Sequence, residues 1–308
     1  MTPSRAVAGD LREGARWGRA QWAKNTLLYA LARLALGAAS LLPRAVARAA
    51  GAAAGALAYV IFAGARRTAH ANAARALSHL PERARRGVVR RAYLGLGAEL
   101  GDAARMLRVP AAPLPLTAEA REVLRAARAE GRGVVFASAH LGPWERVAAG
   151  LVAAGEPFVT VAREAYDPRF TRLYERMRGH GGVRAIYRGD AGAAARIVRA
   201  LRSGGVLGMP MDLASRVPSV DVPFLGHVAR TPVGPARLAL RTGAAVVVGT
   251  VARDLAGALV VTATRVHADD LDAGERGERE LTARINAELS RRILALPELW
   301  VWMHPRFG

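Results

Sequence analysis

The sequence predicts an α/β layered domain with a mostly parallel central sheet flanked by helices, preceded by a helical N-terminal region. Residues 1–110 carry apolar residues at helical spacing almost throughout. A proline-rich stretch at 109–117 (VPAAPLPLT) then marks the clearest boundary in the chain. Beyond it, short β-rich runs alternate with helical ones, as in parallel strands joined by crossover helices. We therefore divide the chain into 1–110 and 111–308 and expect one continuous fold.

Composition narrows the classes of partner. The 308-residue chain has a formal net charge of +20 and a pI near 11.6, which favours anionic partners such as nucleic acid, acidic lipid surfaces or an acidic carrier protein. The arginines are spread along the whole chain and no nucleic-acid-binding module is recognisable, so we expect no nucleic-acid partner. The sequence contains no cysteine, which excludes disulfides, thiol catalysis and thiolate metal sites.

The N-terminal region favours contact with a membrane. No short apolar run ending in a small-residue cleavage site stands near the N-terminus, so we expect no cleaved signal. Residues 49–65 (AAGAAAGALAYVIFAGA) carry no charge, but 17 residues rich in alanine and glycine are at the lower limit for a bilayer span. We expect an interfacial or shallowly inserted helix, with Arg66 and Arg67 against anionic headgroups. A full span and a buried helix of a soluble protein remain alternatives.

Local signals place the helices of the first half of the chain. Pro43 suits the first turn of a helix over 43–63, and a second helical pattern covers 80–108. Thr117 is a good N-cap for a helix that runs through Ala129.

The second half alternates between strands and helices. The expected strands are 133–138, 157–162, 183–187, 206–210, 245–251 and 259–264. The expected helices are 144–154, 168–178, 191–202 behind an Asp190 cap, 233–242 and 275–296.

The stretch SAHLGPWE (138–145) is the first candidate site. His140 follows a predicted strand, at the edge where open α/β sheets place their chemistry. Pro143 suits the first helical position, which puts Glu145 in the first turn, near the positive end of the helix dipole. A bend at Gly142 brings the Glu145 carboxylate to one ring nitrogen of His140 and leaves the other nitrogen as a general base. An ordinary capping glutamate beside a surface histidine is the alternative.

The absence of other catalytic motifs near His140 and Glu145 limits the class of reaction. No serine or cysteine is placed as a nucleophile, so the base would deprotonate a substrate hydroxyl directly. The sequence has no G-x-S-x-G elbow, phosphate-binding P-loop or H-E-x-x-H zinc motif. A hydrolase that activates water with the same histidine remains an alternative.

Several linked motifs resemble one known family. AHLGPWE (139–145) resembles the H-x4-D/E box of glycerolipid-type acyltransferases, in the form found in the late acyltransferases of lipid A biosynthesis. The stretches 161–170, 210–254 and 296–307 (LPELWVWMHPRF) are similar to the later blocks of that family, and 66–82 is similar to its arginine-rich entry to an asparagine-containing helix. The resemblance spans about residues 25–307 and places the chain in the lysophospholipid-acyltransferase-like superfamily.

The resemblance implies a glycerolipid-acyltransferase-like fold and a peripheral enzyme on the cytoplasmic face of the inner membrane. The enzyme would move a fatty acyl chain from acyl-carrier protein or CoA to a hydroxyl of a lipid A precursor or related glycolipid. His140 would be the base and Glu145 its orienting partner, with no metal and no cofactor besides the donor. An acceptor such as a phosphatidylinositol mannoside or a lysophospholipid remains an alternative, as does a non-catalytic membrane scaffold.

The resemblance also implies five substrate-binding residues: Arg163, Asp212, Arg216, Phe224 and Thr231. Arg163 would bind a phosphate or hold the substrate, and Asp212 and Arg216 would shape the acceptor pocket. Phe224 is apolar enough to line an acyl groove, and Thr231 would set the turn before the helix at 233–242. For each residue a purely structural role, such as a surface arginine, a helix cap or core packing, remains open.

Overall fold

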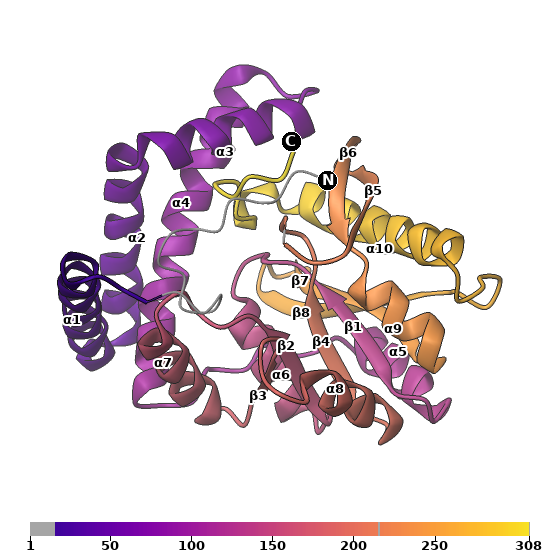
Figure 1. The fold of residues 1–308 in the computed structure, drawn as a ribbon. Helices are drawn as coiled ribbons and strands as arrows, with labels where there is room; N and C mark the ends of the chain where they lie inside the picture. The colour runs from indigo at the N-terminus through magenta and orange to yellow at the C-terminus, as the bar shows by residue number, and fades with distance from the viewer. Residues whose placement is uncertain (1–15, 215, 308) are drawn as a thin grey trace.

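The computed structural model describes residues 16–214 and 216–307. Residues 1–15, on which the expectation of no cleaved signal rests, lie outside this range. Helices from the first third of the chain stand beside a sheet that helices cover on both faces (Figure 1). The predicted fold class, a mostly parallel sheet flanked by helices behind a helical N-terminal region, is confirmed.

The central sheet has six strands in the order β3-β2-β4-β1-β7-β8, and only the β7–β8 pair is antiparallel. The strands are β1 (Val134–Ser138), β2 (Phe158–Ala162), β3 (Arg184–Tyr187), β4 (Val206–Pro210), β7 (Ala245–Arg253) and β8 (Leu259–Val266). Residues 134–137 of the central strand β1 are buried because helices cover both faces, which explains its unbroken apolar sequence. All six strands were predicted, within two residues at each end.

A separate two-stranded hairpin was not predicted from the sequence. It consists of β5 (Ser219–Phe224) and β6 (His227–Pro232), joined by a turn in which Leu225 and Gly226 have positive φ. Pro223 in β5 lacks the N–H that a central strand needs, but an isolated hairpin has two edges and tolerates a proline there.

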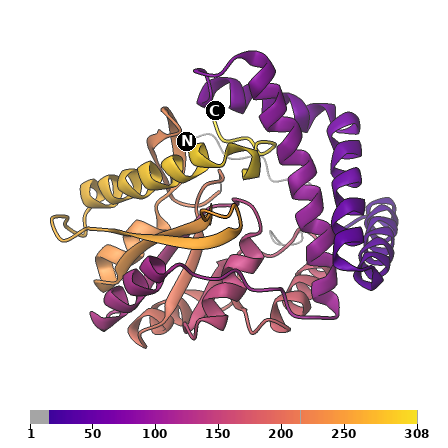
Figure 2. The ribbon, with the colours of Figure 1, turned by 180° about the vertical axis from the view of Figure 1, so that it is seen from behind.

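Helices α8, α9 and α10 cover one face of the sheet, and α5 and α6 cover the other (Figures 1 and 2). The helices of the second half are α5 (Ala118–Ala129), α6 (Trp144–Ala153), α7 (Pro168–Gly179), α8 (Ala193–Arg202), α9 (Gly234–Thr242) and α10 (Glu275–Ala295). Thr117 caps α5 as predicted, since its side chain accepts a hydrogen bond from the Ala120 amide. The prediction that Asp190 caps α8 was wrong: Gly192 in the left-handed conformation is the N-cap and no side chain caps this helix.

The N-terminal helices are α1 (Arg19–Leu41), α2 (Arg44–Ile61), α3 (Ala63–Ala76) and α4 (Glu82–Ala104), followed by the short 3-10 helix η2 (Arg105–Leu107). The backbones of α2 and α4 touch, because a Cβ atom added at Gly97 would lie 2.2 Å from the Gly51 carbonyl oxygen. Within the described residues, α2 is the one helix long and apolar enough to cross a membrane by length and composition, and only 11% of it is buried. So little burial does not fit the alternative of a core helix.

The C-terminal segment joins the two parts of the fold. The 3-10 helix η3 (Pro297–Leu299) contacts α4, and the chain then continues through residues 300–307. The side-chain amide of Asn72 in α3 donates hydrogen bonds to the carbonyl oxygens of Trp302 and His304, at 2.9 and 2.8 Å. These contacts hold Trp300 and the residues after it beside the carboxyl edge of the sheet.

Candidate active site

His140 and Asp212 meet because they follow neighbouring strands. β1 and β4 are parallel, with Ser138 of β1 paired with Pro210 of β4. Two residues beyond each strand, the backbone places His140 and Asp212 at the same carboxyl edge.

The Asp212 carboxylate holds His140 by two bonds. Asp212 Oδ1 lies 2.8 Å from His140 Nδ1, and Asp212 Oδ2 accepts the backbone N–H of His140 at 2.9 Å. Asp212 is completely buried, whereas 29% of the His140 side chain is exposed. The ring therefore turns Nδ1 toward the protein and leaves Nε2 for a ligand.

Trp300 fixes the carboxylate from the other side. Its indole N–H donates to Asp212 Oδ2 at 2.8 Å, and the indole is 1% exposed. The neighbouring Trp302 ring packs edge-on against it, with 4.7 Å between ring centroids, and donates its own N–H to the Pro297 carbonyl. Asp212 thus accepts three hydrogen bonds, two of which come from groups that a rigid backbone and a packed indole hold in place.

These contacts set the charge of the pair. Burial opposes the charge on Asp212, but His140, Trp300 and the His140 amide stabilise the carboxylate and lower its pKa. Burial opposes the charge on His140 as well, yet the charge of Asp212 and its hydrogen bond outweigh that cost and raise the pKa of His140. An ionised carboxylate can only accept, so the neutral imidazole carries its proton on Nδ1 and presents a basic Nε2.

The prediction that Glu145 orients His140 was wrong in its geometry. Both oxygens of the Glu145 carboxylate pair with the Arg178 guanidinium of α7, at 2.9 and 2.6 Å. Glu145 does stand in the first turn of α6, as predicted, and its charge helps to raise the pKa of His140, against the opposing charge of Arg178. It therefore acts on the imidazole through space, while Asp212 makes the direct bond.

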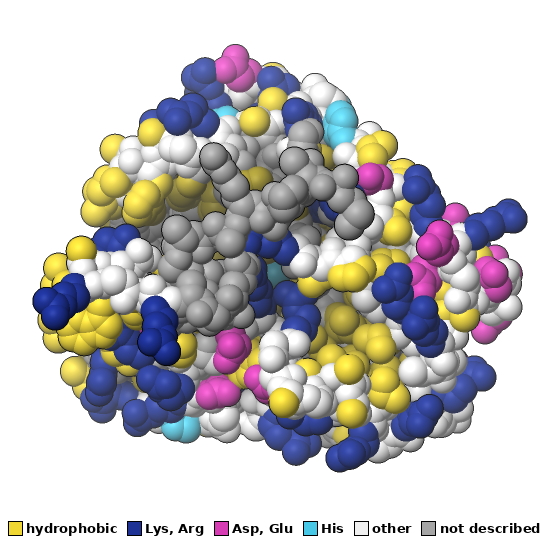
Figure 3. Space-filling view, in the orientation of Figure 1, with side chains coloured by type: hydrophobic (Ala, Val, Ile, Leu, Met, Phe, Trp, Pro, Cys, Tyr) yellow, Lys and Arg dark blue, Asp and Glu magenta, His cyan; other side chains and the backbone are white. Residues whose placement is uncertain are grey.

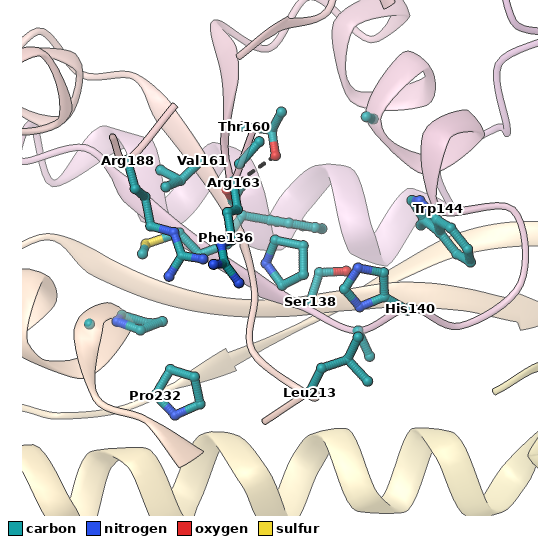
Figure 4. A pocket seen from close by; sticks show the side chains of 18 of the residues that line it. Phe136, Ser138, His140, Trp144, Thr160, Val161, Arg163, Arg188, Leu213 and Pro232 are labelled. Atoms are coloured by element: carbon teal, nitrogen blue, oxygen red, sulfur yellow. Dashed lines mark hydrogen bonds between the residues drawn. The ribbon is translucent and has the colours of Figure 1, made fainter. Parts of the chain in front are cut away.

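Two cavities meet at the histidine. The main cavity, of about 640 Å³, reaches along the sheet past Phe136, Phe158, Met209 and Leu213 (Figure 4). The side cavity, of about 430 Å³, opens toward the N-terminal helices past Leu36, Leu96, Leu100 and Leu173. Five residues line both cavities: His140, Trp144, Glu145, Tyr174 and Arg178. Two elongated ligands can thus approach the same imidazole from different sides.

The other predicted site residues are dispersed. Arg163 follows β2 and lines the main cavity, on the side of His140 away from Trp144 in Figure 4. Arg216 is exposed on the loop between β4 and β5 and lines neither cavity. Asp212, predicted to shape an acceptor pocket, instead binds His140 as described above.

Phe224 and Thr231 belong to the protein interior. Phe224 is 1% exposed, with its ring centroid 5.8 Å from that of Trp300, so the prediction that it lines an acyl groove was wrong. Thr231 is fully buried, and its hydroxyl accepts hydrogen bonds from Asn286 and Arg306, which fasten β6 to α10 and to the C-terminal segment. Such a buried hydroxyl does not reach a substrate.

Sequence reasoning gave no role to Trp300, Arg178 or Arg188, all of which the structure places at or beside the site. Trp300 stands in the C-terminal tryptophan-rich motif, which could have pointed to it as a site residue. Arg178 and Arg188 could not be singled out, because the chain contains many arginines. Within the part of the chain that the structure describes, no group of three or more His, Cys, Asp or Glu could hold a metal ion.

Comparison with known proteins gives a family match and several relatives. The model of the family described as bacterial lipid A biosynthesis acyltransferase matches residues 20–308. A phosphatidylinositol mannoside acyltransferase of Mycobacterium tuberculosis is 33% identical over 126 residues, which is 40% of this chain and 39% of that protein. A protein of the same name from Mycolicibacterium smegmatis is 31% identical over 117 residues, 37% of this chain and 38% of its own length. The chain thus spans about two fifths of the length of the curated relatives it matches.

Proposed function

The chain belongs to the bacterial lipid A biosynthesis acyltransferase family, and from this premise we propose that it transfers a fatty acyl chain from a thioester to a hydroxyl of a membrane lipid. The family resemblance predicted from the sequence motifs is confirmed by that match. The observation that carries the proposed activity is the His140 imidazole, bound by the buried Asp212 at the junction of two cavities.

The geometry supports general-base catalysis without a covalent enzyme intermediate. His140 Nε2 accepts the proton of the acceptor hydroxyl while the hydroxyl oxygen attacks the thioester carbonyl carbon. The imidazolium that forms is stabilised by the Asp212 carboxylate on Nδ1. When the tetrahedral intermediate collapses, the carbon–sulfur bond breaks and the thiolate takes the proton from Nε2. The products are an ester and a free thiol, and His140 returns to its neutral form with no cofactor consumed.

The two cavities suit two lipid-like substrates. A reaction between a thioester and a lipid hydroxyl needs both substrates bound at once, with their reacting atoms about 3 Å apart. The main and side cavities share His140 and Trp144, so chains bound in each would meet at the imidazole. Most of the side chains that line the side cavity from α1, α4 and α7 are apolar, as an alkyl chain requires.

For the substrates, we propose acyl-carrier protein or CoA as the donor carrier and a lipid A precursor or related glycolipid as the acceptor. The family match supports this acceptor. A phosphatidylinositol mannoside is the second candidate, because relatives that are 31% and 33% identical to this chain, over about two fifths of its length, carry that name. The net charge of +20 would attract either an acidic carrier protein or a CoA thioester.

We further propose that α1 and α2 hold the protein on the cytoplasmic face of the inner membrane. Large apolar side chains project from both helices, with arginines between them (Figure 3). Leu27, Leu31 and Leu34 lie on one face of α1 and are 60%, 53% and 71% exposed. In vesicle sedimentation, replacing Leu27 and Leu31 by glutamate would release the protein from anionic vesicles. The same change at Leu255, exposed at the β7–β8 turn, would not.

The activity is tested by incubating the purified protein with labelled acyl-carrier protein or CoA thioesters and with membrane lipids. We expect a labelled lipid ester that disappears in His140→Ala and persists in His267→Ala, which changes a surface histidine. Mass spectrometry of the product would identify the acceptor. Formation of free fatty acid without any lipid ester would point to a hydrolase, and equal activity in both variants would exclude His140 as the base.

A further inference from the structure

Two arginines stand side by side at the rim of the main cavity. The register of the parallel strands β2 and β3 pairs Ala162 with Tyr187, and the Arg188 amide donates to the Ala162 carbonyl at 3.0 Å. Arg163 and Arg188 are the next residue on each strand, so the sheet sets them next to each other. Both side chains point into the cavity on the side of His140 opposite Trp144 (Figure 4).

In the described part of the chain, these two arginines lack the acidic partners that the other arginines of the cavity have. Arg178 is bound by Glu145, and Arg237 by Glu278. Within the described residues, neither Arg163 nor Arg188 forms an ion pair with an acidic side chain, and Glu145 is the one acidic side chain lining this cavity. Among the residues that the structure describes, no acidic side chain balances these two positive charges at the rim.

Keeping these two charges together has a cost. Both side chains are exposed to solvent, yet desolvation by the surrounding protein atoms and the neighbouring charge of Arg163 both lower the pKa of Arg188. An anion placed between the two guanidinium groups removes the repulsion, and phosphate oxygens match the geometry of the guanidinium fork.

We infer that Arg163 and Arg188 form a phosphate-binding site that anchors a phosphorylated substrate while its reacting end lies at His140. This inference rests on the proposed acyl transfer and names what the rim of that site recognises. The phosphate group belongs either to the phosphopantetheine arm of the donor or to the headgroup of the acceptor, and both would present it at the mouth of the cavity.

Binding of inorganic pyrophosphate, measured by calorimetry, tests the site without turnover. We expect Arg163→Gln and Arg188→Gln each to weaken binding by about tenfold or more, as expected for the loss of a charge-assisted contact. Arg184→Gln is the matched control, because it removes the same charge from the opposite end of β3. Equal affinity in all four proteins overturns the inference. A variant-sensitive site in a protein without transferase activity would instead refute the proposed function alone.

Kinetics with matched substrates then identify the source of the phosphate. If the donor is anchored, Arg188→Gln raises KM for an acyl-phosphopantetheine by about tenfold and leaves KM for the acyl-pantetheine unchanged. If the acceptor is anchored, the same variant raises KM for a phosphorylated acceptor only. Unchanged KM values for both phosphorylated substrates would contradict a role in substrate binding.

Discussion

Replacing Asp212 by asparagine tests how His140 is held. Asparagine has nearly the same shape, and its side-chain oxygen can still accept the Trp300 indole and the His140 amide, which contact Oδ2 at 2.8 and 2.9 Å. Its amide group would then face Nδ1 and donate to it. The proton of the neutral imidazole would move to Nε2, where no base remains to accept the proton of the acceptor hydroxyl.

The magnitude follows from this reversal. A positioned general base contributes about 10²- to 10⁴-fold, and a catalytic histidine forced into the wrong tautomer loses about 10⁴-fold in kcat in a well-studied hydrolase triad. We therefore expect kcat to fall by about 10³- to 10⁴-fold in Asp212→Asn. KM should change little, because Asp212 is fully buried and does not touch the substrate.

The assay compares initial rates of labelled acyl transfer with thermal unfolding of the same preparations. Asp221→Asn is the control, since this carboxylate is more than half exposed on β5 and lies 4.0 Å from the guanidinium of Arg230. A kcat for Asp212→Asn above a tenth of the wild-type value would refute the reasoning. Loss of activity in Glu145→Gln alone would return the orienting role to Glu145.

Three further predictions follow from the geometry of the site and the fold. Because the raised pKa of His140 keeps the imidazole protonated to higher pH, the rate should rise with pH through a midpoint above 6.5 in the pH–kcat/KM profile. Trp300→Phe removes one hydrogen bond to the carboxylate and should lower kcat by about tenfold at unchanged KM, whereas Trp302→Phe should not. Gly97→Ala should lower the free energy of unfolding by about 1–3 kcal/mol in denaturant titrations, because its Cβ would strike the α2 backbone, unlike Gly37→Ala, where the space is open.

A specific result would contradict each of these three predictions. A midpoint below 6.5 would mean that burial of the imidazole outweighs the carboxylate. Equal kcat values in the two tryptophan variants would assign Trp300 to packing only. Equal stability of the two glycine variants would mean that α2 and α4 can separate without cost.

The layered fold could be predicted because the local sequence of each strand in the central sheet is typical of a β-strand. The buried run at 134–137 and the cap at Thr117 depend on neighbours in sequence, and the structure contains both. The hairpin 219–232 was missed because its stability comes from packing against α10, whereas its own sequence contains proline and turn residues.

The partner of His140 could not be predicted for a related reason. Glu145 lies five residues away and Asp212 seventy-two, so a local argument favours the glutamate. Asp212 reaches the imidazole because the strand order places β4 next to β1. The sequence of neither strand predicts that order. Glu145 instead forms an ion pair with Arg178, which lies 33 residues away on another helix.

The most direct test of the central claim is the protonation of the His140 ring in the resting protein. Nitrogen NMR of the protein labelled with ¹⁵N-histidine, with His140→Gln to assign the signal, distinguishes the two neutral tautomers above the pKa. The Asp212–His140 geometry predicts a protonated Nδ1 and an unprotonated Nε2. A proton on Nε2 in the wild-type protein would mean that Asp212 does not hold the ring as a base, and the proposed mechanism would fail.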